Sequence, residues 1–178
     1  MSLNPQPLTE VDEEMILGVY SDDPLIQFEN ASKFRKILSH EENPPIDKII
    51  ESGVVPRFVE FLKKDDDNVI QYAAASVLRL ISEENTKVLI DHGVIEIFVH
   101  LLGSATSDVH LRFQATRALG NVARASVESR NYVLRRGALK PVLDQLNENT
   151  QMWMLRTAAW TLSKLFSGQP QLLLRQVF

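Results

Sequence analysis

The residue types that most often carry enzyme chemistry are sparse in this 178-residue chain and show no catalytic spacing. Cysteine is absent, which excludes disulfides, thiolate metal ligands and thiol nucleophiles. No phosphate-binding glycine loop and no Gly-x-Ser-x-Gly motif occurs. No two histidines stand in a His-x-x-x-His pair; they are His40, His92, His100 and His110. We therefore expect a protein that is not an enzyme.

Asp65, Asp66 and Asp67 form a run of acids that could attract a cation. Three consecutive acids on a loop point in different directions, and the run lacks the alternating ligand spacing of a calcium loop. The sequence favours a solvated turn at this point. We expect neither a metal ion nor a cofactor.

Two tryptophans and one cluster of bases are the better candidates for binding other molecules. Trp153 and Trp160 could each be a surface anchor or a packing residue, since indole rings serve both purposes. Arg130, Arg135 and Arg136 could bind nucleic acid, but a solvated cluster that stabilises a helix C-terminus is the simpler interpretation.

The elements that must position these residues repeat along the chain. Gly53, Gly93 and Gly137 lie 40 and 44 residues apart, and each precedes an apolar segment, a polar gap and a second apolar segment. This period is typical of stacked helical repeats, in which neighbouring units create the core together. The glycines are expected to end helices, because a left-handed residue commonly follows a helix.

Helical spacing dominates every unit. Phe58, Phe61 and Leu62 stand at i, i+3 and i+4, and no alternating strand pattern competes. We predict an all-α fold whose residues 1–11 are disordered. The expected repeat units cover about residues 12–52, 53–92, 93–136 and 137–178.

Charge is unevenly distributed along a chain whose net charge is -4. Residues 1–52 hold eleven acids and four bases, whereas residues 53–178 hold twelve acids and fifteen bases. The acidic balance argues against a nucleic-acid partner, and no apolar run is long enough to cross a membrane. Two surfaces with different electrostatic preferences, or solvated helix faces that merely differ, both fit this distribution.

Nine strings of the chain are similar to the opening armadillo repeats of importin alpha, and the resemblance runs from about residue 12 to about residue 170. They are Ser21-Asp-Asp-Pro24, Phe34-Arg-Lys-Ile-Leu-Ser39, Asn43-Pro-Pro-Ile-Asp47, Ser52-Gly-Val-Val-Pro-Arg-Phe-Val-Glu-Phe-Leu62, Glu84-Asn-Thr-Lys87, Ile90-Asp-His-Gly93, Ala118-Leu-Gly-Asn-Val-Ala123, Gln145-Leu-Asn-Glu148 and Trp160-Thr-Leu-Ser163.

This resemblance implies a right-handed superhelical solenoid of about four armadillo repeats that acts in nuclear import. In the family, the third helix of each repeat lines a concave groove with a Trp and, four residues later, an Asn, which share one helix face. The Asn binds the backbone of an extended cargo signal peptide, and the indoles flank slots for cargo lysines. The implied locations are the cytoplasm and the nucleus.

The groove positions that the resemblance assigns are Ser76, Leu80, Thr86, Arg117, Asn121, Ala125, Trp160 and Lys164. One Trp and one Asn keep the family identity, Trp160 and Asn121, and they belong to different repeats. Arg117 and Lys164 place bases in a groove made for basic peptides, and like charges in an interface are unfavourable.

We therefore expect an adaptor that binds nuclear localisation signals weakly or in an altered way. The alternative is an armadillo scaffold for protein–protein interaction outside transport. In the family an Arg- and Lys-rich N-terminal segment binds importin beta, and no base precedes Lys33 here. Importin beta binding by this chain is therefore not expected.

Overall fold

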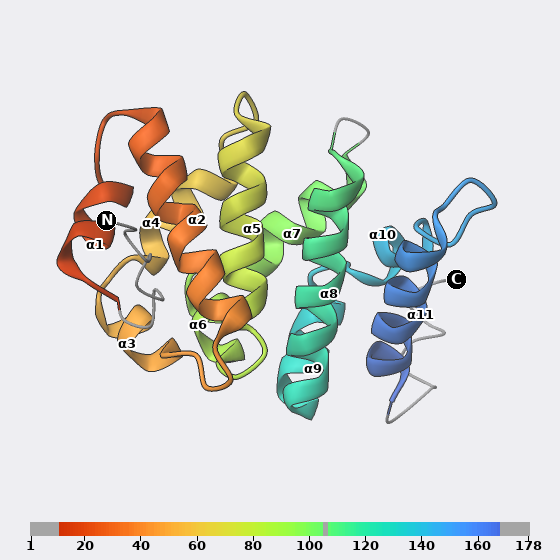
Figure 1. Cartoon of the computed structure of the whole chain (residues 1–178). Coiled ribbons are helices and arrows are strands. Elements are labelled where there is room, and N and C mark those ends of the chain that lie inside the picture. The colour runs from red at the N-terminus through yellow and green to blue at the C-terminus, as the bar shows by residue number, and fades with distance from the viewer. Residues whose placement is uncertain (1–10, 105–106, 168–178) are drawn as a thin grey trace. The chain divides into compact units, whose positions relative to one another are not determined.

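The computed structural model describes residues 11–104 and 107–167, and this part of the chain is helical throughout, without a strand (Figure 1). The all-α prediction is confirmed. The chain divides into two compact units, residues 1–81 and residues 82–178. Unit 1 contains α1 (Glu13–Val19), α2 (Pro24–His40), α3 (Ile46–Glu51), α4 (Val55–Leu62) and α5 (Asn68–Ile81). Unit 2 contains α6 (Thr86–Asp91), α7 (Val94–Gly103), α8 (Val109–Ala125), α9 (Val127–Arg135), α10 (Leu139–Leu143) and α11 (Met152–Phe166).

The three glycines that mark the period lie in the connections between consecutive helices. Gly53, Gly93 and Gly137 have φ angles of 79°, 67° and 78°, and one residue separates each glycine from the end of the preceding helix. A left-handed backbone is unfavourable for residues with a Cβ atom, so glycine is the residue that these positions require. The prediction that they end helices is confirmed.

The core of unit 1 is aromatic where α2 and α4 meet. Phe34 and Phe58 contact edge to face with ring centres 5.4 Å apart, and Phe58 and Phe61 do so at 6.2 Å. All three side chains are fully buried. Two long-range hydrogen bonds hold α1 to this core, from the Tyr20 hydroxyl to the Gly53 carbonyl and from Arg57 Nε to the Val19 carbonyl.

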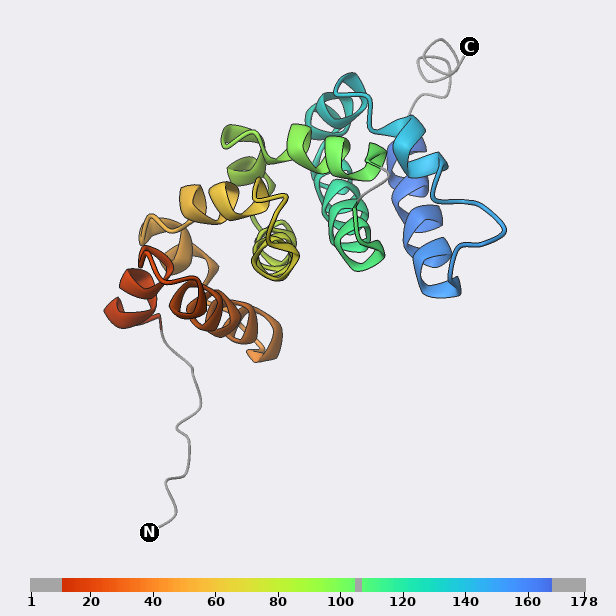
Figure 2. The same ribbon diagram turned by 90° about the horizontal axis from the view of Figure 1, so that it is seen from above.

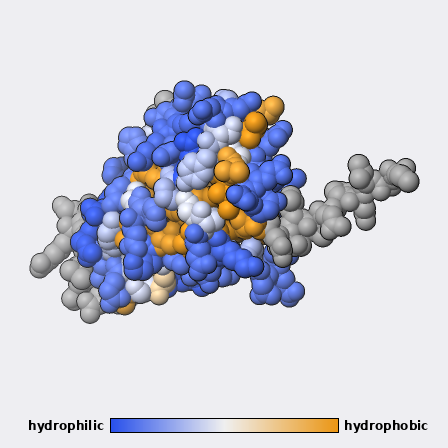
Figure 3. Space-filling model, turned by 90° about the vertical axis from the view of Figure 1, so that its left-hand side faces the viewer, coloured by the Kyte–Doolittle hydropathy of each residue, from blue (hydrophilic) through white to orange (hydrophobic). Residues whose placement is uncertain are grey.

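The outer side of unit 1 keeps several large apolar side chains exposed. Figure 3 views the protein from the side on which α1 and α2 lie in Figure 1, and apolar residues interrupt a mostly polar surface there. The exposed apolar residues of these two helices and their connection are Leu17, Tyr20, Leu25, Ile26 and Phe28.

Unit 2 is built around α8, which packs against α7, α9 and α11. Small buried residues on the facing helices, Ala115, Ala118 and Ala158, allow a close approach. Ala159, the next residue on α11, is exposed.

Some expectations lie outside the described residues or stay untested. Residues 1–10 of the segment expected to be disordered, and the apolar stretch from Gln171 to Phe178, fall outside the described part. The four repeat boundaries remain a prediction. Within the described part, no helix has the length and apolar character of a membrane span, and no group of three or more His, Asp or Glu side chains could hold a metal ion.

Candidate functional site

The helices α8 and α11 run side by side and form the best-defined candidate surface of unit 2 (Figures 1 and 2). A Cβ atom placed on Gly120 would lie 2.2 Å from the Trp160 ring, so the indole rests directly against the backbone of α8. The Thr161 hydroxyl donates a buried hydrogen bond of 2.9 Å to the Thr116 carbonyl. Together these contacts fix the position of Trp160 against α8.

Two cationic side chains of the same protein contact the Trp160 ring. The Arg117 guanidinium carbon lies 3.9 Å from the ring centre, and Lys164 Nζ lies 5.6 Å from it. Both distances are within the range of a cation–π interaction, which contributes about 0.5–2 kcal/mol depending on exposure. The structure therefore brings together three of the residues predicted from sequence, Arg117, Trp160 and Lys164. The Trp160 ring in this cluster already contacts two cations of the same chain.

Asn121 is directed into the protein. Its side chain is 3% exposed, and its Nδ2 atom donates a 2.9 Å hydrogen bond to Ser82 Oγ. Ser82 is the first residue of unit 2 and directly follows α5, so this bond ties the start of unit 2 to α8. This partner could not be predicted from sequence, because the two residues are 39 apart and their spacing does not indicate the contact.

Thr86 and Ala125 lie at helix ends of unit 2. Thr86 is the first residue of α6 and is half-buried, next to Asn85, whose side-chain oxygen accepts a hydrogen bond from the Val88 amide. Ala125 is the last residue of α8 and is exposed. Neither position carries a charge.

Ser76 and Leu80 belong to α5 of unit 1, apart from the six predicted positions in unit 2. Their side chains are buried, at 2% and 8% exposure. The Ser76 hydroxyl donates to the Tyr72 carbonyl one turn earlier, at 2.9 Å. Both side chains serve as packing residues in this structure.

Trp153, about two helical turns before Trp160 on α11, packs against α8. Its ring stacks on His110 with centres 5.4 Å apart and planes 4° apart, and it meets Phe113 edge to face at 5.3 Å. The packing interpretation of Trp153 fits this geometry. Its partners His110 and Phe113 could not be predicted from sequence, because they lie on another helix.

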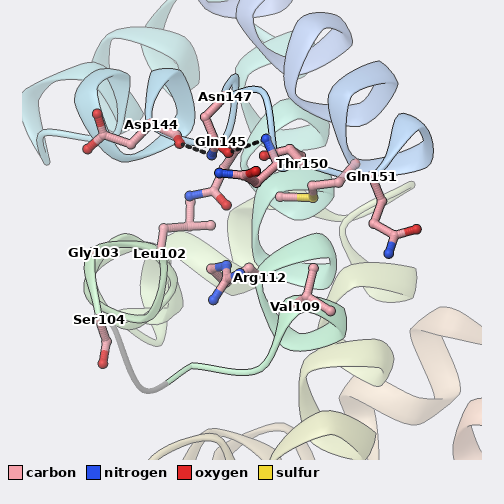
Figure 4. Close-up of a pocket in the computed structure, with 12 residues that line it drawn as sticks. Leu102, Gly103, Ser104, Val109, Arg112, Asp144, Gln145, Asn147, Thr150 and Gln151 are labelled. Atoms are coloured by element: carbon pink, nitrogen blue, oxygen red, sulfur yellow. Dashed lines mark hydrogen bonds between the residues drawn. The ribbon is translucent and has the colours of Figure 1, made fainter.

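A polar cavity of about 410 Å³ lies in unit 2 where the α10–α11 connection meets α7 and α8 (Figure 4). Its lining amides largely bond within their own loop: Asn147 Nδ2 donates to the Asp144 carbonyl at 3.1 Å, and Asn147 Oδ1 accepts from the Asn149 amide at 3.1 Å. Arg112 reaches across from α8 and donates to the Ser107 carbonyl. The cavity therefore presents mostly satisfied polar groups.

Comparison with known proteins agrees with this architecture. The family model described as the Armadillo/beta-catenin-like repeat matches residues 42–83 and 82–124. A crystal structure of computationally designed armadillo repeat proteins for modular peptide recognition aligns with a TM-score of 0.81 and 22% identity, over 92% of this chain and 68% of that one. A designed armadillo repeat protein in complex with the peptide (KR)4 aligns with a TM-score of 0.80 and 20% identity, over 92% of this chain and 67% of the other. The chain thus contains armadillo repeats within residues 42–124 and has an armadillo-repeat fold.

Sequence relatives place it more narrowly. Importin subunit alpha-2 of Arabidopsis thaliana is 52% identical over 160 residues, and importin subunit alpha-1a of Oryza sativa subsp. japonica is 55% identical over the same length. Each alignment covers 88% of this chain and 30% of the relative. Over most of its length the chain is therefore similar to importin alpha subunits, and it spans about a third of their length.

Proposed function

We propose that the chain is an adaptor of nuclear import that binds extended localisation-signal peptides on the face of α8 and α11. The observation that carries this proposal is the 52% identity to an importin alpha subunit over 88% of the chain. On this proposal the protein acts in the cytoplasm and the nucleus by binding alone, without catalysis or a metal ion.

Signal recognition is weakened at the same face. An ammonium group of a cargo lysine would have to displace Arg117 from the Trp160 ring and approach Lys164, both of which carry the same charge. Asn121 is 3% exposed and already donates to Ser82, so its amide offers a peptide backbone little accessible surface. Ala125 offers no carboxylate, and the buried Ser76 and Leu80 present little surface.

A second candidate function follows from the same observations. A ring that holds two cations of its own and an Asn that bonds internally also suit an armadillo scaffold for a protein partner outside transport. The two functions differ in whether a Lys-rich signal peptide binds at all.

Fluorescence anisotropy with a labelled Lys-rich signal peptide and its Gln-substituted counterpart separates them. We expect saturable binding of the Lys-rich peptide with a Kd of tens of micromolar, corresponding to about -6 to -7 kcal/mol. A Kd on the nanomolar scale would contradict the weakening. Binding no stronger than that of the Gln peptide would favour the scaffold.

A double variant tests the cause of the weakening. Arg117→Trp with Lys164→Asn removes both cations from the indole and returns an aromatic face, so the Lys-rich peptide should bind at least about tenfold more tightly, or about 1.4 kcal/mol. Arg135→Gln is the matched control, because it removes an exposed base from α9 and leaves the Trp160 cluster intact. An unchanged affinity in a folded double variant would remove this cluster as the cause.

The 178-residue chain is further proposed not to bind importin beta directly, since no Lys or Arg precedes Lys33. The two purified proteins, mixed at micromolar concentration, should elute separately from a sizing column. A reproducible complex would overturn this part of the proposal.

A further inference from the structure

The two helices that carry the Trp160 cluster contain no acidic residue. Val109–Ala125 (α8) and Met152–Phe166 (α11) hold five bases between them and neither Asp nor Glu. The whole of residues 1–52, by contrast, contains eleven acids. A helix pair of this composition has a positive potential that its own side chains do not cancel.

Two of these bases lie at the Trp160 ring and two more lie on the same helices, and we call the four the basic face: Arg117, Lys164, Arg124 and Arg156. Arg117 and Arg124 are seven residues apart on α8, whereas Arg156 and Lys164 lie four residues before and after Trp160 on α11. Residues with these spacings share a helix face. Arg117 and Lys164 also meet at the same indole, so both helices direct charge to Trp160.

No described carboxylate neutralises the basic face. Within the described residues, none of its four side chains forms an ion pair, although Lys87, Arg136 and Lys140 of unit 2 do pair with acids. Ser82 contacts α8 through its hydrogen bond with Asn121, and two acids, Glu83 and Glu84, follow it in the sequence. Two unpaired cations at one ring repel each other, and an incoming anion would relieve that repulsion.

We propose that the basic face binds an acidic, extended segment of a partner protein, with carboxylates at Arg117 and Lys164 and an apolar or aliphatic stem against Trp160. The proposal rests on the proposed function in one respect, because both require that α8 and α11 bind an extended peptide. It reverses the charge of the preferred ligand.

Size and charge favour a peptide over a nucleic acid. From Arg156 to Lys164 the helix rises about 12 Å, which is the length of about four residues of extended chain. Arginine binds carboxylates in a fork geometry that suits such short, discrete acidic groups. The net charge of -4 for the whole chain disfavours binding to a long polyanion beyond this face.

The test compares four labelled probes on the full chain by anisotropy: an Asp/Glu-rich peptide, its Asn/Gln counterpart, a Lys-rich signal peptide and a short single-stranded DNA. We expect the acidic peptide to bind at least about tenfold more tightly than each of the others, and to weaken severalfold between about 50 and about 500 mM salt. If the acidic and neutral peptides bind equally, or if DNA binds most tightly, the inference is overturned. A Lys-rich peptide that binds most tightly would overturn the inference and leave the proposed function standing, whereas failure of every peptide would remove both.

Matched variants locate the site. Arg117→Gln with Lys164→Gln should weaken the acidic peptide at least about tenfold, or about 1.4 kcal/mol. Arg135→Gln, which removes one exposed base from α9, should change it less than about twofold. Arg117→Lys keeps the charge and replaces the double variant if that variant loses helicity. It should weaken binding of the acidic peptide about threefold, because lysine cannot form the bidentate fork of arginine. Equal effects of the Arg135 and Arg117 changes would show that only overall charge matters.

Discussion

Equivalent repeat positions differ between α5 of unit 1 and the pair α8 and α11 of unit 2. In α5 the positions are filled by Ser76 and Leu80, which are uncharged and buried. In α8 and α11 the counterparts of Ser76 are Arg117 and Trp160, which are partly exposed and in contact with each other. The counterparts of Leu80 are the buried Asn121 and the partly exposed Lys164. The Ser76 position is therefore part of the packing, whereas its counterparts present a cation and an indole.

Equivalent positions of the repeat therefore lie on the same face of their helices, but this placement alone does not decide whether the side chain there is buried or exposed. Small and aliphatic side chains leave room for neighbouring elements to close over the position, and burial follows. Long cationic side chains keep their heads in solvent or on an aromatic ring. Residue type therefore decides whether a ladder position binds partners.

The largest expected effect comes from breaking the aromatic core of unit 1. Phe58→Ala removes a fully buried ring that contacts both Phe34 and Phe61 and leaves a cavity, at a cost of about 3–5 kcal/mol in the free energy of unfolding. Urea denaturation followed by circular dichroism measures it. Hydrogen exchange should show the loss of protection first in α2, α4 and α5.

Phe166→Ala is the control for this change, since the Phe166 side chain is 42% exposed. It should cost less than about 1 kcal/mol. Similar costs for the two variants would mean that the phenylalanine cluster does not dominate the stability of unit 1.

A tryptophan introduced at equivalent positions of the two units tests the contrast between them directly. Ser76→Trp forces a large ring into a 2%-exposed site and should cost about 3 kcal/mol. Arg117→Trp replaces a partly exposed side chain beside Trp160 and should change the stability by less than about 1 kcal/mol. Thermal unfolding of both variants compares them, and an equally stable Ser76→Trp protein would show that α5 can present a groove residue after all.

The repeat architecture could be predicted from sequence because its signals are local. The period of the glycines, the 3.6-residue apolar spacing and Asp23-Pro24 as a helix start all act within a few residues, and the structure confirms them. The capping oxygen of Asp23, for example, accepts a hydrogen bond from the Leu25 amide. Such rules need no knowledge of the tertiary fold.

The chemistry of the candidate site could be predicted only in part. The resemblance identified Arg117, Trp160 and Lys164, but the contact of both cations with the same ring depends on how α8 packs on α11. The bond between Ser82 and Asn121 joins residues 39 apart, and no local pattern encodes it. Burial of Ser76 likewise depends on neighbouring helices. Side-chain partners across elements are decided by packing.

The helix contact that fixes Trp160 can be broken by a single methyl group. In Gly120→Ala the new Cβ atom would lie 2.2 Å from the Trp160 ring and 2.7 Å from Thr161 Oγ1, so the helices must separate, at a cost of about 2 kcal/mol. Gly103→Ala is the matched control, since no atom lies within 4 Å of its Cβ position. The control should be neutral or slightly stabilising, because alanine favours helix over glycine by about 1 kcal/mol. Chemical denaturation and the fluorescence of Trp160 measure both variants, and equal stabilities would contradict the close contact.

The smallest expected effect concerns a feature that the two units share, a side-chain cap at a helix start. Ser126 caps α9 in unit 2, where its hydroxyl oxygen accepts from the Ser129 amide at 3.0 Å, much as Asp23 caps α2 in unit 1. Ser126→Ala should cost about 1 kcal/mol, and Asp23→Ala should cost a similar amount. Denaturation midpoints of the two variants compare the caps, and a tenfold difference in folding equilibrium would show that the units do not share this feature.

The cap of α9 also has an electrostatic consequence that can be measured at one side chain. The pKa of Glu128 is lowered, first by a hydrogen bond from its own backbone amide and second by one from the Ser126 hydroxyl. Because the folded pKa lies below the unfolded one, this carboxylate favours folding above its unfolded pKa, and the contribution is lost as the pH falls through the folded pKa. Ser126→Ala removes the second cause and keeps the first, so the pKa of Glu128 should rise partway toward its ordinary value. An NMR titration of the Glu128 side chain in the two proteins measures the change, with Glu148, an exposed acid of the α10–α11 connection, as the internal control. If the pKa of Glu128 stays where it was, the Ser126 hydroxyl has no part in stabilising the carboxylate, and the cap acts on the backbone alone.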